Sequence, residues 1–239
     1  MSHRSLLLLG RHYTTLGPLG VAELPDGGAL ALSRGVLRKS YRYVDPNEDA
    51  VLLLRTERGT LLAVADGYNG TAASELAIEY VAHAGPELIW TAPERFRGRM
   101  EQLAIDISEQ LQAVEPSRSC LLVSVVTGRQ CRWFCLGDSS LFRSTEPESA
   151  TPSNDLVLEP YLRALPQPTE FWSGAYELEP GERIAVVSDG VTNFVEDTRS
   201  ISTLLHEAES DAQAARDLAF AAMQGGAGDN IGIATIRVT

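Results

Sequence analysis

The chain has 239 residues, of which 44% are hydrophobic and 22% are charged, and this balance predicts one globular domain over residues 1–239. Its formal net charge of -12 and its pI of about 4.8 argue against a nucleic-acid partner, because an acidic chain repels phosphate backbones.

The first part of the chain predicts strands and turns. The four leucines at 6–9 are too few for a signal-peptide core or a transmembrane helix, so we expect a first β-strand there. No other stretch is apolar enough to span a membrane, and we expect a cytoplasmic protein with no membrane partner. The apolar runs 51–55 and 61–65 flank a short polar turn and predict a β-hairpin.

Two helices are expected next. Residues 72–84 place apolar side chains on one face, and Thr71 is the expected N-cap. A longer helix is expected over residues 93–114, with Pro93 near its start and an apolar stripe along one side.

The remaining pattern returns mainly to strands. Residues 144–174, rich in Pro, Ser, Thr and Glu, predict a loop or a weakly ordered insertion. Sequential hairpins favour antiparallel sheets whose outer faces must be covered by amphipathic helices, so we expect a layered α+β sandwich. The other expected elements are strands at 121–126, 131–136, 141–143, 184–187 and 231–238 and a helix at 212–223.

The chain has three cysteines, Cys120, Cys131 and Cys135, and no CxxC pair. This usage predicts neither a disulfide framework nor a zinc ribbon, and it fits the cytoplasm. Cys131 and Cys135 fall on one face of an expected strand, where we expect them to pack in the core.

Four short acidic signatures stand at the ends of the expected strands. Taken alone, each one is most often a turn. However, Asp66 and Asp189 both follow directly on an apolar strand, which is a rigid mount, and the glycine after each lets a backbone carbonyl approach a cation. The four signatures are Asn47-Glu48-Asp49, Asp66-Gly67, Ser188-Asp189-Gly190 and Asp229-Asn230.

Oxygen ligands of this kind are those that Mg²⁺ and Mn²⁺ prefer. Two such ions about 3.5–4 Å apart need one carboxylate that bridges them and others that hold each ion. Four aspartates and one glycine carbonyl can meet that need, so the signatures predict a metal-dependent hydrolase.

The order and spacing of five motifs resemble those of the metal-dependent protein phosphatase family, the type 2C serine/threonine phosphatases, in its bacterial form. The resemblance covers residues 47–238. The motifs that carry it are Asn47-Glu48-Asp49-Ala50, Ala65-Asp66-Gly67-Tyr68-Asn69-Gly70, Leu136-Gly137-Asp138-Ser139-Ser140-Leu141, Val187-Ser188-Asp189-Gly190-Val191 and Gly228-Asp229-Asn230-Ile231.

The resemblance implies a four-layer α-β-β-α sandwich of two antiparallel sheets flanked by helices, with Mn²⁺ or Mg²⁺ in a cleft at one end. It implies that Asp66 bridges two ions and that the Gly67 carbonyl holds one of them. Asp49 would act at the first ion, directly or through water.

The same resemblance assigns the remaining acidic residues. Asp189 and Asp229 would hold the other ion, and Glu48 would bind metal-bound water. Asp106 is the candidate ligand of a third, weaker ion, unless it is an ordinary exposed residue of its helix. Asp138 would brace a turn by hydrogen bonds.

The implied activity is hydrolysis of phosphoserine and phosphothreonine monoesters on proteins by a hydroxide that bridges the two ions. No protein nucleophile is needed, in agreement with the absence of Cys-x5-Arg, HExxH and GxSxG motifs from the sequence. We expect the partner to be a phosphorylated protein substrate and the chain to be a monomer.

The chain departs from the family pattern around these motifs. Tyr68 stands where His or Met is common, and it either supplies a proton or shapes the cleft wall. Asn69 replaces a glycine, which asparagine can do because it tolerates left-handed backbone angles. Val44 stands where bacterial members carry the arginine that holds substrate phosphate, and Arg38 or Arg42 either replaces it or is an ordinary surface residue.

Residues 144–174 are also shorter than the flap subdomain usual at this place in the family. Two alternatives therefore stay open beside a general phosphatase. One is a pseudophosphatase, which binds a partner with impaired turnover. The other is a flapless regulatory phosphatase specific for one partner protein.

Overall fold

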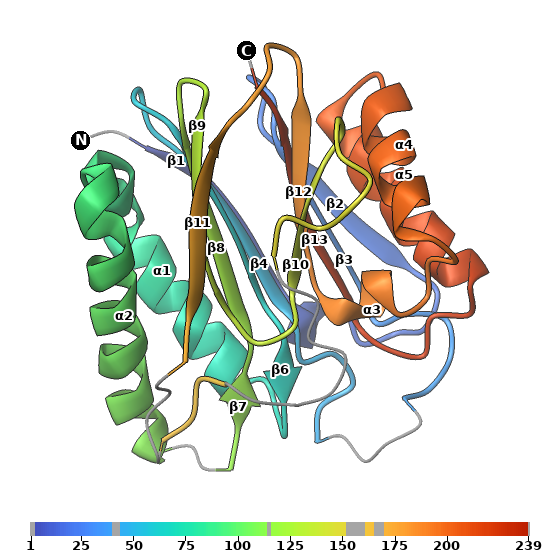
Figure 1. The fold of residues 1–239 in the computed structure, drawn as a ribbon. Helices are drawn as coiled ribbons and strands as arrows, with labels where there is room; N and C mark the ends of the chain where they lie inside the picture. Colours follow the sequence, from blue (N-terminus) through green and yellow to red (C-terminus); the bar gives the residue numbers. More distant parts are fainter. Residues whose placement is uncertain (1–2, 40–43, 114–115, 152–160, 165–169, 239) are drawn as a thin grey trace.

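The computed structural model describes residues 3–39, 44–113, 116–151, 161–164 and 170–238. Two antiparallel β-sheets face each other, and helices cover their outer faces, so the protein has four layers in the order α-β-β-α (Figure 1). The predicted fold class is confirmed. No helix in these ranges is both long and apolar enough to cross a membrane.

The first sheet has six strands and contains the predicted hairpin. β4 and β5 pair along their whole length, from Ala50 opposite Ala65 to Arg55 opposite Thr60. Every residue of β5 is buried, because one of its faces meets the second sheet and the other meets a helix. The strand order is β1 (Arg4–Leu9), β4 (Ala50–Arg55), β5 (Thr60–Ala65), β8 (Leu121–Thr127), β9 (Gln130–Leu136) and β11 (Trp172–Glu177).

The predicted loop over residues 144–174 is partly wrong, because Trp172–Glu177 forms the edge strand β11. This strand pairs with β9, and Gly174 lies against the ring of Trp133, where a side chain would not fit. Since β11 is partly exposed and contains Gly174, its sequence lacks the apolar alternation that marks a strand. Residues 152–160 and 165–169 of the predicted loop lie outside the described residues.

The second sheet has five strands. Two of them, β2 and β3, come from the N-terminal region that the sequence pattern resolves only into short apolar pieces. The predicted strand at 141–143 joins this sheet rather than the one that holds β8 and β9. The strand order is β10 (Ser140–Arg143), β12 (Arg183–Val187), β13 (Ile231–Arg237), β3 (Ala29–Ser33) and β2 (Leu19–Glu23).

Helices α1 (Ala72–Trp90) and α2 (Pro93–Gln110) cover the first sheet. Thr71 stands at the predicted N-cap position, but it has helical backbone angles and its side chain makes no capping hydrogen bond. α1 also runs past the predicted end at 84 and through Pro86, because Leu88 and Ile89 are buried against the sheet. Helices α3 (Asp189–Thr192), α4 (Thr198–Glu207) and α5 (Asp211–Gln224) lie on the second sheet (Figure 1).

One hydrophobic core lies between the two sheets. Cys131 and Cys135 are buried there among leucine, valine and isoleucine side chains, as predicted, and all three cysteines are free. The chain ends lie at one end of the sandwich, whereas β6 (Gly67–Tyr68), β7 (Arg118–Ser119) and α3 lie at the other (Figure 1). The acidic signatures belong to this second end.

Candidate metal centre

Two antiparallel strand pairs bring the four acidic signatures to one end of the sandwich. Asp49 directly precedes β4 and Asp66 directly follows its partner β5. In the other sheet, Asp189 follows β12 shortly after its end, and Asp229 precedes the partner strand β13. Since antiparallel partners start and end at the same edge, each sheet delivers two aspartates to the same place.

A cavity of about 270 Å³ opens at this place. Three of the predicted metal-binding aspartates face it, together with the predicted glycine, and two tyrosines form part of its wall. The described residues that line it are Asp66, Gly67, Tyr68, Cys120, Asp138, Tyr161, Asp189 and Asp229.

Asp66 is the centre of the acidic cluster. Its carboxyl group lies within hydrogen-bonding reach of the carboxyl groups of both Asp49 and Asp189. Burial raises the pKa of Asp66 well above its usual range, and the negative charges of its aspartate neighbours raise it further. Burial likewise raises the pKa of Asp49 and the pKa of Asp189 to about 7.

Close backbone contacts fix the turn that carries Asp66. A Cβ on Gly67 would lie 2.2 Å from the carbonyl oxygen of Glu48, so only glycine fits there. The Asp66 carbonyl accepts hydrogen bonds from the Cys120 amide at 2.9 Å and from Ser119 Oγ at 3.0 Å. Asn69 has φ of 63°, which confirms that asparagine serves in place of glycine in this turn.

Asp49 lies behind Asp66 and carries an unsatisfied atom. Its Oδ2 accepts a hydrogen bond of 2.8 Å from Ser188 Oγ, whereas its Oδ1 is buried and has no hydrogen-bond partner. A buried carboxylate oxygen without a partner is costly unless a proton or a cation meets it. The aspartate carboxylates of the cluster, together with the Gly67 carbonyl, are therefore suitable ligands for a hard divalent ion. In the described ranges, no group of three His, Cys, Asp or Glu side chains is already arranged around a single ion position.

The structure places the two other predicted acidic ligands away from the cavity. Glu48 is fully buried and its Oε1 accepts hydrogen bonds from the amides of Val44, Asp45 and Gly70. Asp106 lies on α2, where its Oδ1 accepts a hydrogen bond of 2.8 Å from Gln102 Nε2. Neither residue lines the cavity, and their roles at the centre stay predictions.

A sequence model of the protein phosphatase 2C family matches residues 38–221, which is more than half of the chain. The chain belongs to the protein phosphatase 2C family. The resemblance seen in the sequence motifs is thus confirmed, and family membership supports protein serine/threonine phosphatase activity for this phosphatase 2C chain.

Solved structures share this fold at low sequence identity. The catalytic domain of the serine/threonine phosphatase PstP with two manganese ions is 21% identical, with a TM-score of 0.70 over 93% of this chain and 100% of that one. PppA, a key regulatory component of T6SS in Pseudomonas aeruginosa, is 21% identical, with a TM-score of 0.71 over 94% and 99%. RsbX in complex with magnesium is 15% identical, with a TM-score of 0.65 over 93% and 100%. No curated protein sequence matches the chain.

Sequence reasoning about this phosphatase 2C chain missed two residues of the centre. Tyr161 lines the cavity because Leu162 and Ser119 exchange two backbone hydrogen bonds of 2.8 and 3.1 Å, which hold this segment beside β7. Lys39 pairs with two of the acidic residues. Both residues lie in irregular segments, where hydrophobic periodicity gives no information. Lys39 could have been noticed from the composition, because it is the only lysine in the chain.

The raised pKa values predict an unusual pH dependence in the presence of a chelator. Because Asp49 and Asp189 have pKa values of about 7 in the folded protein and 3.8 as the ordinary value, the folded state binds more protons than the unfolded state between these pH values. The free energy of unfolding should therefore fall as the pH rises from about 4 to about 7, by up to about 1.4 kcal/mol per pH unit for each group.

Urea denaturation in EDTA at pH 5 and pH 8 measures this trend. Added Mg²⁺ should reduce or reverse it, because the ion favours the deprotonated carboxylates of the folded state. A midpoint in EDTA that is higher at pH 8 than at pH 5 would contradict the prediction.

Proposed function

We propose that this chain hydrolyses phosphoserine and phosphothreonine monoesters on proteins and depends on two divalent ions, Mn²⁺ or Mg²⁺. The observation that carries the proposal is the Asp66 carboxyl group, which lies at an open cavity between Asp49 of the first sheet and Asp189 of the second. The manganese ions of PstP and the magnesium of RsbX support the choice of ions.

In this proposal the acidic residues keep the roles that the family resemblance implies. Asp66 would hold both ions, Gly67 would offer its carbonyl to one of them, and Asp49 would act beside it. Asp189 and Asp229 would hold the other ion, and Glu48 would act through water. A third ion at Asp106 would require a movement or a bridging water, because Asp106 does not line the cavity.

When bound, divalent ions supply a water nucleophile active near neutral pH and neutralise charge on the phosphoryl group. The chain's own residues shape the space in which this happens. Tyr68 and Tyr161 form part of the wall, and burial raises the pKa of Tyr161 so that its phenol stays protonated and can donate a hydrogen bond into the cavity. Burial likewise raises the pKa of the Cys120 thiol, which donates to Asp138 Oδ1 at 3.0 Å and does not act as a nucleophile.

Asp189→Asn is the direct test of this proposal. Since the substitution removes the charge of a proposed ligand and leaves the shape of the side chain, kcat/KM for a phosphothreonine peptide with Mn²⁺ should fall roughly 10²-fold or more. Phosphate release, measured with and without chelator, gives the result. Asp197→Asn is the matched control, because Asp197 is an exposed cap of α4 and should leave turnover unchanged.

Wild-type protein that releases no phosphate with Mn²⁺ would overturn the proposal. So would an Asp189→Asn variant that turns over substrate as fast as the wild type does.

One observation favours a second candidate, a regulatory phosphatase or pseudophosphatase dedicated to one partner. Val44, at the position of the family's phosphate-holding arginine, is 67% exposed, and the described residues that line the cavity include no lysine or arginine, while Arg42 lies outside the described residues. A partner protein could then supply most of the binding energy. Generic phosphopeptides would be hydrolysed poorly in this case, whereas efficient hydrolysis of a broad peptide panel would exclude it.

The remaining expectations belong to the proposal. We propose a single domain over residues 1–239 that acts as a cytoplasmic monomer on a phosphorylated protein and binds no nucleic acid. The acidic composition supports the last point.

A further inference from the structure

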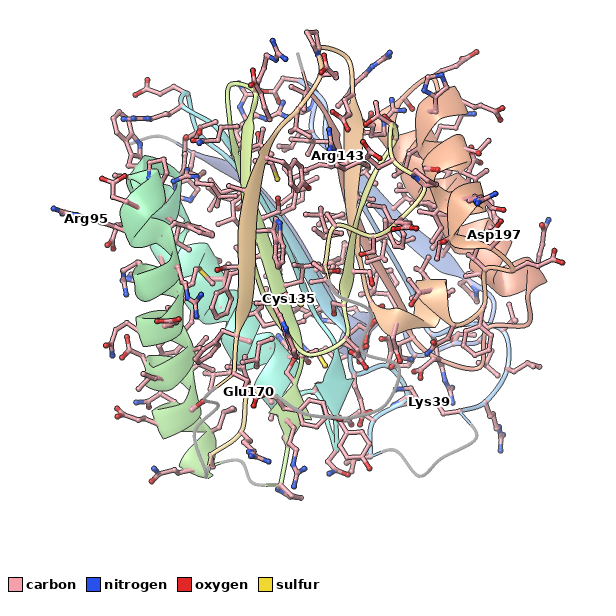
Figure 2. All side chains as sticks on the ribbon, viewed as in Figure 1. Lys39, Arg95, Cys135, Arg143, Glu170 and Asp197 are labelled. Atoms are coloured by element: carbon pink, nitrogen blue, oxygen red, sulfur yellow. The ribbon has the colours of Figure 1, made fainter. Side chains whose placement is uncertain are left out.

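Lys39 is the only lysine in the chain, and every other Lys or Arg position is an arginine. Exposed basic positions therefore use arginine throughout, whereas this lysine is 8% exposed and its side chain is 2% exposed. Figure 2 places it at the end of the sandwich that carries the acidic cluster. An isolated lysine would not be stable in such a buried place without partners of opposite charge.

The partners of Lys39 are carboxylates of the proposed metal centre. Its Nζ lies 2.9 Å from Asp229 Oδ1 and 3.4 Å from Glu48 Oε2. It also lies close enough to Asp49 for its charge to lower the pKa of that carboxyl group, against the larger effect of burial. The ammonium therefore acts on three of the acidic residues at once.

Lys39 does not contact the space where a phosphoryl group would lie. The cavity is lined by Asp229 but not by Lys39, so the ammonium approaches Asp229 from behind. The backbone amide of Asn230 also donates to Asp229 Oδ1, at 2.7 Å. Two donors thus hold one oxygen of Asp229, and the carboxyl group still lines the cavity.

An ammonium at this place has two opposing effects on a divalent ion bound by Asp229. It orients the carboxylate, but it also repels the ion, because like charges that lie close together inside a protein are poorly screened. A lysine suits this place better than an arginine because its charge is compact and its donors fit between closely spaced carboxylates.

We propose that Lys39 is an internal cation that competes with the divalent ion held by Asp229 and so sets a weak affinity at that side of the centre. The inference rests on the proposed metal centre and adds a regulatory property to it. Turnover would respond to changes in the concentration of free Mg²⁺ or Mn²⁺, because the ion at this side would not be bound permanently.

A titration of the wild-type protein tests the proposal without any variant. Protein labelled with ¹⁵N-lysine has one side-chain Nζ resonance, because Lys39 is the only lysine. Titration with Mg²⁺ should shift this resonance as the ion takes over part of the Asp229 charge. A resonance that does not move while calorimetry shows that Mg²⁺ binds would overturn the proposal.

Lys39→Gln tests the sign of the effect. The amide can still donate a hydrogen bond to Asp229 but carries no charge, so calorimetry should show Mg²⁺ binding about tenfold tighter than in the wild type. Arg143→Gln is the matched control, since it makes the same change in net charge, and Arg143 pairs with the buried Glu182 at 2.7 Å. Figure 2 shows Arg143 far from Lys39, toward the other end of the sandwich, so this control should leave Mg²⁺ affinity unchanged.

The results separate this inference from the proposed function. Unchanged or weaker Mg²⁺ binding in Lys39→Gln overturns the competition, whatever the rate of phosphate release. A wild-type protein that binds Mg²⁺ but releases no phosphate overturns the proposed function and leaves the competition intact. If the variant does not fold, the wild-type resonance titration still decides.

Discussion

Asp66→Asn should make the metal-free protein more stable and at the same time remove its metal-dependent turnover. Because the pKa of Asp66 is raised well above 3.8, folding at neutral pH requires this carboxyl group to take up a proton or to remain charged among other carboxylates. Asparagine has a similar shape but is uncharged, so folding then requires neither proton uptake nor the burial of a charge at this position. The free energy of unfolding in EDTA at pH 7.5 should therefore rise.

The same substitution removes the carboxylate that is proposed to hold both ions. A loss of about 4 kcal/mol of transition-state stabilisation corresponds to a roughly 10³-fold lower kcat/KM. Urea denaturation and phosphate release from one preparation give both numbers. The stability gain should shrink at pH 5, where less is required to protonate Asp66 on folding, and a gain that is independent of pH would contradict this explanation.

Removing a charge from the buried ion pair at the other end of the sandwich should lower the stability of the protein, whereas Asp66→Asn should raise it. Arg183 Nε donates to Asp211 Oδ1 at 2.8 Å, and both residues are almost fully buried. Arg183 Nη1 donates to the carbonyls of Leu205 and Ala208, whereas Asp211 Oδ2 accepts from the amide of Gly28 at 2.7 Å. The ion pair thus connects β12, the junction of α4 with α5, and the turn between β2 and β3.

Arg183→Met should lower the free energy of unfolding by about 3–5 kcal/mol, because it leaves a buried carboxylate and two carbonyls without their partner. Asp211→Asn should also be destabilising, because it removes the attraction between Asp211 and Arg183. Asp66→Asn differs because it removes repulsion between Asp66 and neighbouring aspartates. The double variant should lose less than the sum of the two single losses. Strictly additive losses would show that the two side chains do not stabilise each other.

The parts of the fold that the sequence predicts are those with strong local periodicity. The hairpin of β4 and β5 and the strands β8, β9 and β13 are fully or almost fully buried, so their apolar runs are unambiguous. β11 is a half-exposed edge strand, and the sheet to which β10 belongs depends on contacts distant in sequence. The local sequence pattern predicts neither the strand β11 nor the sheet to which β10 belongs.

The candidate site divides in the same way. Asp66, Asp189 and Asp229 could be predicted because each stands next to a strand that is itself recognisable. Tyr161 reaches the cavity through a bridge to Ser119, and Lys39 reaches Asp229 across the fold, so both depend on tertiary structure. Glu48 also stands in an acidic signature, but its carboxyl group accepts hydrogen bonds from backbone amides and pairs with Lys39, and it does not line the cavity.

Each sheet supplies its own half of the acidic cluster, and this division has a mechanical consequence. Asp49 and Asp66 belong to the strand ends of one sheet, and Asp189 and Asp229 to those of the other. Ions bound between these two pairs of aspartates would connect the two sheets at an end of the sandwich where the repulsion between carboxylates otherwise destabilises their packing. Amide hydrogens near the ends of β5 and β12 should then exchange more slowly when Mg²⁺ is present, so that the catalytic ions would also serve as a reversible clasp on the sandwich.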